Sequence, residues 1–338
     1  MVDAALCAVL GGLALCPAVS RRTRVTSGVA ASVLAGISAL TDYEGGVAPI
    51  LSLQRHRAVE AVSGTVLLAA GARRGGGLLL LAGAAQLGLA LSSDGAAHHG
   101  APETCYPPLD TPKPFADDLW IVDSAMRPGL PVRMTVIRLP DGALLLHSPT
   151  RYDPVLQRAL AALGPITHIV APSLVHWMFA KPWQDAVPGA TVWAAPGLGE
   201  RGQVRRSGLR IDRTLDDTAP AEWGGAIELA VVRGAGGFSE VAMLHRPSLT
   251  LMMTDLMQNF EPRKLPWVLQ PIARLLGNTA PDSRAPAHLR AVVGFTPNRA
   301  AARRVVGWGA RRVVVAHGLP IERDAAAVVT RSLAWLTG

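Results

Sequence analysis

The stretch VVVAHGLP (313–320) places an apolar run directly before His317, Gly318 and a proline. A short apolar run that is rich in β-branched residues and bounded by turn residues predicts a buried strand. Histidine can titrate near neutral pH and can bind metal, so a histidine at the end of such a strand is a candidate ligand. An ordinary core histidine with a satisfied ring fits the same position, and the rest of the chain has to decide between the two.

Around this stretch, residues 115–338 show the pattern of an α/β domain. Alternating residues on both sides of the PDG turn at 140–142 predict a hairpin, and residues 166–172 predict a further strand. Residues 240–256 predict two more strands, and helical spacing before and after the last strand predicts two closing helices. Strands that come first as hairpins and then alternate with helices indicate sheets covered by helices on their outer faces.

The order of these segments resembles the metallo-β-lactamase fold, an αββα sandwich with its metal site at one edge of two sheets. More closely, it resembles domain-of-unknown-function family 4336, over about residues 106–338. The matching phrases are YPPLDTPKPFADDLWIVD, RMTVIRLPDGALLLHSPT, HIVAPSLVHWMF, VWAAPGL, EVAMLHRPSLTLMMTDLMQNF and VVVAHG. The resemblance implies an αββα fold for this part of the chain.

The ligand pattern of the resembled fold is incomplete in this sequence. Its usual run HxHxDH is absent, and the phrase SLVHWMF (173–179) stands where the closer family has a form such as N-x-x-H-H. Ser173 replaces the asparagine, His176 is kept and Trp177 replaces the second histidine. The phrases MMTDL and VVVAHG match the other ligand positions and supply Asp255 and His317.

The resemblance implies a reduced, mononuclear metal site of His176, Asp255 and His317. Two histidines and a carboxylate suit zinc or iron, and ligand atoms on one ion would lie ~3–4.5 Å apart. The strand ends at His147 and His245 supply candidate residues of a surrounding pocket, together with Trp177 and Ser173. A site without metal is equally open, because each of the three side chains also fits a structural role. Asp255 would then cap a turn, His317 would bond a carbonyl group and His176 would support its loop.

The first 93 residues differ in composition from the rest of the chain. Apolar runs at 4–19, 25–40, 61–71 and 78–91 are separated by arginines and turn residues. These runs approach the ~20 apolar residues that span a bilayer, so a multi-pass membrane helical domain of about four helices is expected over residues 1–93, with membrane lipid as its partner. A cleaved signal and an alanine-rich helical bundle in water are the alternatives, and the side on which the C-terminal domain lies stays open.

Residues 40–70 resemble the small bacterial membrane domains of the SPW-repeat type, although the SPW signature itself is missing. The matching positions are Thr41, Asp42, Tyr43, His56, Glu60, Ser63 and Gly64. Residues 94–114 are rich in glycine, alanine, serine and proline and predict a linker that leads to the domain at 115–338.

Composition limits the function classes. The net charge of +8 is spread thinly and forms no basic stripe with interleaved aromatic residues, which argues against nucleic-acid binding. The three cysteines form no CxxC pair, and neither a GxSxG nor a P-loop motif is present. Two functions stay open: a metal-dependent hydrolase that acts on an unidentified small molecule with bound water as the nucleophile, and a non-catalytic pseudo-hydrolase that acts as a binding or scaffold protein.

Overall fold

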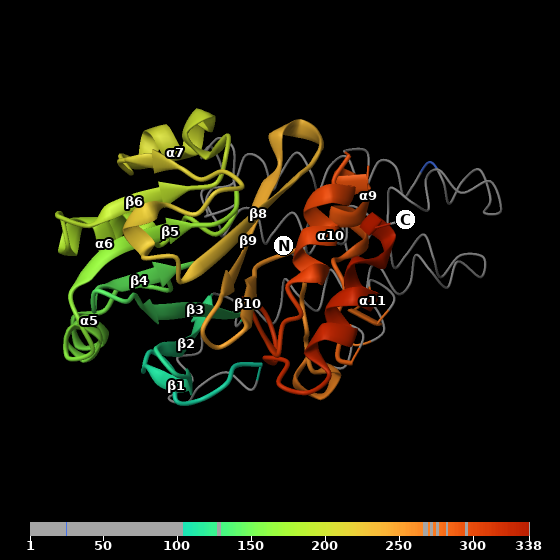
Figure 1. Cartoon of the computed structure of the whole chain (residues 1–338), viewed down its shortest axis with the longest axis horizontal. Helices are drawn as coiled ribbons and strands as arrows, with labels where there is room; N and C mark the ends of the chain where they lie inside the picture. The colour runs from blue at the N-terminus through green and yellow to red at the C-terminus, as the bar shows by residue number, and fades with distance from the viewer. Residues whose placement is uncertain are drawn as a thin grey trace. The chain divides into compact units, whose positions relative to one another are not determined.

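Figure 1 shows a computed structural model of the chain. It describes residue 25 and residues 104–126, 130–265, 270, 273–274, 277–281, 283–294 and 297–337. Apart from residue 25, the expected membrane domain at 1–93 and its SPW-type resemblance lie outside the described residues. Within the described residues, no helix has the length and apolar character needed to cross a bilayer.

The larger sheet has seven strands within the described residues, in spatial order β1 to β7. Strands β1 to β4 are antiparallel neighbours, whereas β4 to β7 run parallel. The strands are β1 (Lys113–Ala116), β2 (Leu119–Met126), β3 (Leu130–Arg138), β4 (Leu144–His147), β5 (Ile166–Ala171), β6 (Thr191–Ala194) and β7 (Arg213–Thr214). Helices α5 (Pro154–Ala161), α6 (Ala180–Ala186) and α7 (Gly202–Ser207) alternate with the parallel strands.

The smaller sheet has four strands among the described residues, in the order β11-β10-β9-β8. Only β10 and β11 run parallel. The strands are β8 (Ile227–Arg233), β9 (Ser239–His245), β10 (Thr250–Met253) and β11 (Arg312–Val315). Helices α9 (Ala287–Gly294), α10 (Arg299–Gly307) and α11 (Ala325–Thr337) follow β10, and short 3-10 turns span Leu198–Glu200, Ala221–Trp223, Ala235–Gly237 and Pro262–Lys264.

Three apolar clusters stack these elements into four layers. Alternate residues of β2 to β6, among them Ile121 and Leu145, face the inner residues of β8 to β11, among them Met243 and Met252. The outer face of the larger sheet packs against α5, α6 and α7. The outer face of the smaller sheet packs against α9, α10 and α11, which lie together on the right of Figure 1. The domain is therefore an α/β sandwich of αββα type, as the segment order predicted.

Two segments differ from the sequence-based description. Residues 104–114, expected to belong to a linker, hold a fully buried Cys105 and the start of β1. Lys113 forms an ion pair with the buried Asp123 of β2, which ties this segment to the sheet. Residues 198–210, for which no helix or strand was predicted, form a 3-10 turn and α7, because Leu198 and Val204 are buried in the outer core. The remaining domain boundaries stay a prediction.

Candidate metal centre

The candidate site forms where four strands end. Parallel neighbours end at the same edge of a sheet, so the residues after β4 and β5 meet, as do those after β10 and β11. His176 lies in the turn after β5, and Asp255 and His317 each follow their strand by two residues. The backbone also links the two sheets here, because the Leu174 N–H donates to the Ser239 carbonyl and the Val241 N–H donates to the Pro172 carbonyl.

The structure brings the three expected ligands together. His176 Nε2 lies 3.4 Å from Asp255 Oδ2, and His317 Nε2 lies 3.5 Å from Asp255 Oδ1. One ligand atom from each side chain lies within 4.8 Å of the other two. These separations are close to the ~3–4.5 Å expected for ligand atoms that share one ion at bonds of about 2.1 Å. Metal binding itself stays a prediction.

Two serines position the His176 ring. The Ser173 hydroxyl accepts hydrogen bonds from the backbone N–H groups of Val175, at 3.3 Å, and His176, at 3.2 Å, so it fixes the turn that carries the ring. Ser148, directly after β4, places its hydroxyl oxygen 2.8 Å from His176 Nδ1. The other ring nitrogen, Nε2, is buried and has no hydrogen-bond partner. It is therefore the nitrogen available to a ligand.

The His317 ring is fixed by β3. Its Nδ1 lies 2.8 Å from the carbonyl oxygen of Pro131. The buried Arg133 donates from Nη1 to the carbonyl oxygens of Val315 and Gly318, at 2.8 and 2.6 Å. Arg133 is itself paired with Asp123 at 2.6 Å, with both side chains almost completely buried. An ion pair in the larger sheet thus anchors a loop of the smaller one.

Asp255 is positioned by a buried carboxylate that the sequence analysis did not single out. The Glu240 carboxylate accepts hydrogen bonds from the backbone N–H groups of Thr254, Asp255 and Leu256, at 2.7, 3.0 and 3.0 Å. Burial, and then the charge of Asp255, raise the pKa of Glu240 to about 7, although hydrogen bonds from Thr254 and Leu256 oppose this rise. The Gln258 amide donates to Asp255 Oδ1 at 3.0 Å. Asp255 is therefore held from both its backbone and its side chain.

The electrostatics of the cluster favour a positive charge beside Asp255. Burial alone would raise the pKa of Asp255, but His176 and His317 outweigh burial and hold the pKa well below its usual range. A carbonyl oxygen only accepts, so His317 Nδ1 must carry the hydrogen that it donates to Pro131. In the neutral ring, Nε2 then presents a lone pair to a carboxylate oxygen. A metal ion shared by both groups, or a second proton on the ring, removes this repulsion.

His147 lies at the same edge, on the inner face of β4. Leu145, two residues earlier, packs between the sheets, and alternation places the His147 side chain on the same face. Burial, with a smaller contribution from His176, lowers the pKa of His147 to about 3, so its ring is neutral at pH 7. Its Nε2 is buried without a hydrogen-bond partner. Buried polar atoms without partners often mark the place of an ordered water or an ion.

Two of the expected pocket residues make their described contacts in other parts of the domain. His245 pairs with Thr250 at the start of β10, whereas Asp255 follows the end of that strand. His245 is held there by the Ser248 hydroxyl at 2.7 Å from its Nδ1. Trp177 packs into the outer core of the larger sheet with α5, α6 and α7. His245 therefore lies at the opposite end of β10 from Asp255, and the Trp177 side chain belongs to the outer core.

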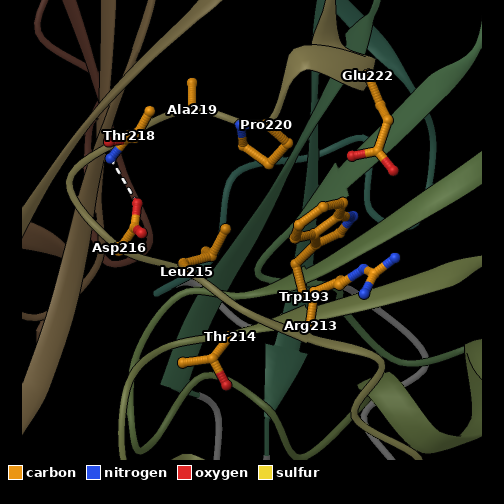
Figure 2. A pocket seen from close by; sticks show the side chains of 9 residues that line it. All are labelled: Trp193, Arg213, Thr214, Leu215, Asp216, Thr218, Ala219, Pro220 and Glu222. Atoms are coloured by element: carbon orange, nitrogen blue, oxygen red, sulfur yellow. Dashed lines mark hydrogen bonds between the residues drawn. The ribbon is translucent and has the colours of Figure 1, made fainter.

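A separate cavity of about 360 Å³ lies beside the edge strand β7. Figure 2 shows the side chains that line this cavity, among them the Trp193 indole, Arg213 and Glu222. The Trp193 indole N–H donates to His168 Nδ1 at 3.1 Å. None of the three candidate ligands lines this cavity, so it is not part of the metal centre.

The sequence matches the model of one known protein family. Residues 121–317 match the family described as Domain of unknown function (DUF4336), and this match covers more than half of the chain. The chain belongs to that family. No curated protein matches it.

Solved structures similar to this chain include three metallo-β-lactamases. The DIM-1 metallo-β-lactamase is 11% identical, with a TM-score of 0.49 over 67% of this chain and 95% of that chain. The enzyme from Pontibacter korlensis is 13% identical, with a TM-score of 0.43 over 67% and 98%. The enzyme from Hirschia baltica is 11% identical, with a TM-score of 0.44 over 67% and 96%.

Proposed function

We propose that the chain is a metal-dependent hydrolase whose ion is held by His176, Asp255 and His317. The observation that carries this proposal is the arrangement of two imidazole nitrogens around one buried carboxylate, at 3.4 and 3.5 Å. The Nδ1–H of His317 leaves a lone pair on its Nε2, and His176 Nε2 has no hydrogen-bond partner, so both nitrogens are available to bind an ion beside Asp255. The donor set fits zinc or iron.

The surrounding residues would each have a defined task. A bound zinc or iron ion would supply a Lewis acid that activates water at neutral pH. Pro131 and Ser148 would orient the two imidazoles, and Glu240 would hold the loop of Asp255 in place. His147, neutral and without a partner on Nε2, is available to hydrogen-bond a water or a polar group of a small-molecule substrate.

The alternative is a non-catalytic pseudo-hydrolase that serves as a binding or scaffold protein. Low exposure supports it, because the His176, Asp255 and His317 side chains are only 9%, 3% and 3% exposed. The departures at Ser173 and Trp177 also support it, because both side chains are committed to local structure. In this alternative, an imidazolium at His317 or His176 would pair with Asp255 in place of a metal.

We also propose that residues 1–93 anchor this domain to a membrane, with lipid as the partner and no role in nucleic-acid binding. The support is in the sequence alone: long apolar runs separated by arginines, and the resemblance of residues 40–70 to SPW-type membrane domains.

Metal content of the purified full-length chain separates the two functions. After exposure to zinc or iron(II) and removal of excess metal, we expect about one ion per wild-type chain. His317→Ala should lose the ion, whereas the matched control His245→Gln, which changes a buried histidine outside the cluster, should keep it. Chromogenic ester, lactam and phosphodiester probes then test hydrolysis. A wild-type chain that retains neither metal would favour the scaffold protein.

A further inference from the structure

Ser148 combines an unusual backbone conformation with a contact to a proposed ligand. It is the first residue after β4 and is almost completely buried. Its backbone φ of 53° lies in the left-handed region, where a residue with a Cβ atom is disfavoured and glycine is not. Its hydroxyl oxygen lies 2.8 Å from His176 Nδ1. A serine therefore occupies a position where the backbone favours glycine, which points to a use for its side chain.

The two proposed histidine ligands have different partners on Nδ1. The Pro131 carbonyl can only accept, so it forces a hydrogen onto His317 Nδ1. The Ser148 hydroxyl can donate or accept, so it accommodates either neutral form of His176. With hydrogen on Nδ1, the ring donates to Ser148 and presents a free lone pair on Nε2. With hydrogen on Nε2, that hydrogen points toward Asp255 Oδ2, which lies 3.4 Å from Nε2, and the Ser148 hydroxyl donates to Nδ1.

We infer that Ser148 is a positioning residue that lets His176 change tautomer when metal binds; this inference rests on the proposed metal site. In the metal-free protein the hydrogen is on Nε2, next to the negative carboxylate of Asp255. In the metal-bound protein the hydrogen is on Nδ1, and the Ser148 hydroxyl rotates to accept it. The ring carries one hydrogen in both states. One proton leaves Nε2 to water and one is taken from water at Nδ1, so the exchange is balanced.

Selective ¹⁵N-histidine labelling of the full-length chain tests this inference, because the nitrogen shifts of each ring report its tautomer. His176 is assigned by loss of its signals in His176→Gln. In the wild type we expect hydrogen on Nε2 without metal and on Nδ1 with zinc. Ser148→Gly should remove the hydroxyl and relieve the backbone, so it should melt at the wild-type temperature or higher while its zinc affinity falls about 10- to 100-fold.

Two further variants separate the hydroxyl from the backbone. Ser148→Ala keeps the disfavoured φ and should lose zinc affinity to the same extent. Asp324→Gly, at an exposed residue with φ of 51°, relieves a similar backbone conformation away from the cluster and should leave zinc affinity unchanged.

Each outcome is decisive. A Ser148→Gly variant that binds zinc as tightly as wild type overturns the inference and leaves the proposed function intact. If the wild type binds neither zinc nor iron(II), the proposed function fails, and the metal-free spectra still test the contact. His176 shifts that are identical in wild type and Ser148→Gly would then overturn the role of Ser148, and a displaced Nδ1 signal would support it.

Discussion

Replacement of Gly318 by alanine is expected to damage the site through the backbone alone. Gly318 follows His317 and has a φ of 97°, which is unfavourable for any residue with a Cβ atom. A Cβ atom at this position would overlap the carbonyl group of Asn259 and lie 2.6 Å from the Phe260 nitrogen. Asn259 cannot easily retreat, because its N–H donates to the His317 carbonyl at 3.0 Å and its own carbonyl accepts from Leu319 at 2.9 Å.

The size of the effect follows from two contributions. The left-handed conformation costs about 1–2 kcal/mol for a residue with a Cβ atom. The overlap with the backbone of Asn259 adds roughly 1–3 kcal/mol, as for other overpacked sites. We therefore expect Gly318→Ala to lower the free energy of unfolding by about 2–5 kcal/mol. Relief of the overlap moves the loop that carries His317, so zinc affinity should fall as well.

Urea denaturation and zinc titration measure the two effects, and Gly142→Ala is the matched control. Gly142 has a similar φ of 86°, but an added Cβ atom there would meet no atom within 4 Å. The control should lose only the conformational contribution of about 1–2 kcal/mol and keep its zinc affinity. Equal losses of stability in the two variants, with zinc affinity unchanged in both, would refute this reasoning.

Further predictions concern other parts of the chain. Glu240→Gln should lose about 2–4 kcal/mol in urea denaturation, because an amide NH₂ would face a buried N–H of the 254–256 loop; Glu228→Gln, at a half-buried partner of Arg246, should lose little. An equal loss in both variants would contradict a stabilising role for the hydrogen bonds between Glu240 and the backbone of residues 254–256. Burial lowers the pKa of His168 below its unfolded value of about 6.5, so protonation favours the unfolded chain, and the stability from this ring is lost as pH falls below that value. His168→Gln should flatten the pH dependence of unfolding between pH 7 and 5, and an unchanged slope would contradict this. Full-length chain should stay in the membrane pellet after carbonate extraction, and its release would remove the proposed anchor at 1–93. A truncation to residues 103–338 should melt cooperatively, and an aggregated product would place the boundary elsewhere.

Local sequence patterns were sufficient for most of the sandwich. The PDG turn predicted the β3–β4 hairpin, the apolar runs predicted β5 and β11, and helical spacing predicted a helix on each side of β11, as α10 and α11 are observed. The convergence of His176, Asp255 and His317 could be predicted only from the family resemblance, because the sequence pattern of one strand does not reveal which strand lies next to it. Short α7 was missed, because its buried Val204 is surrounded in sequence by arginines and glycines.

The residues that support the site were not predicted, for a physical reason. Glu240 and Arg133 are charged residues inside largely apolar strands, and this was the one sequence feature that could have marked them as buried residues with a structural role. Their partners are backbone groups 14 to 16 and 182 to 185 residues away, so their roles depend on tertiary structure. The sequence did not indicate a role for Ser148, because its left-handed φ cannot be predicted from a serine followed by a proline.

X-ray absorption at the zinc edge of the zinc-loaded full-length chain tests the central claim most directly. We expect a first shell of nitrogen and oxygen at about 2.0–2.2 Å, with the multiple scattering of two imidazole rings, and only one ring in any zinc that His317→Ala retains. A first shell that contains sulfur, one that lacks imidazole scattering, or a spectrum that is unchanged in His317→Ala would contradict a metal centre at His176, Asp255 and His317.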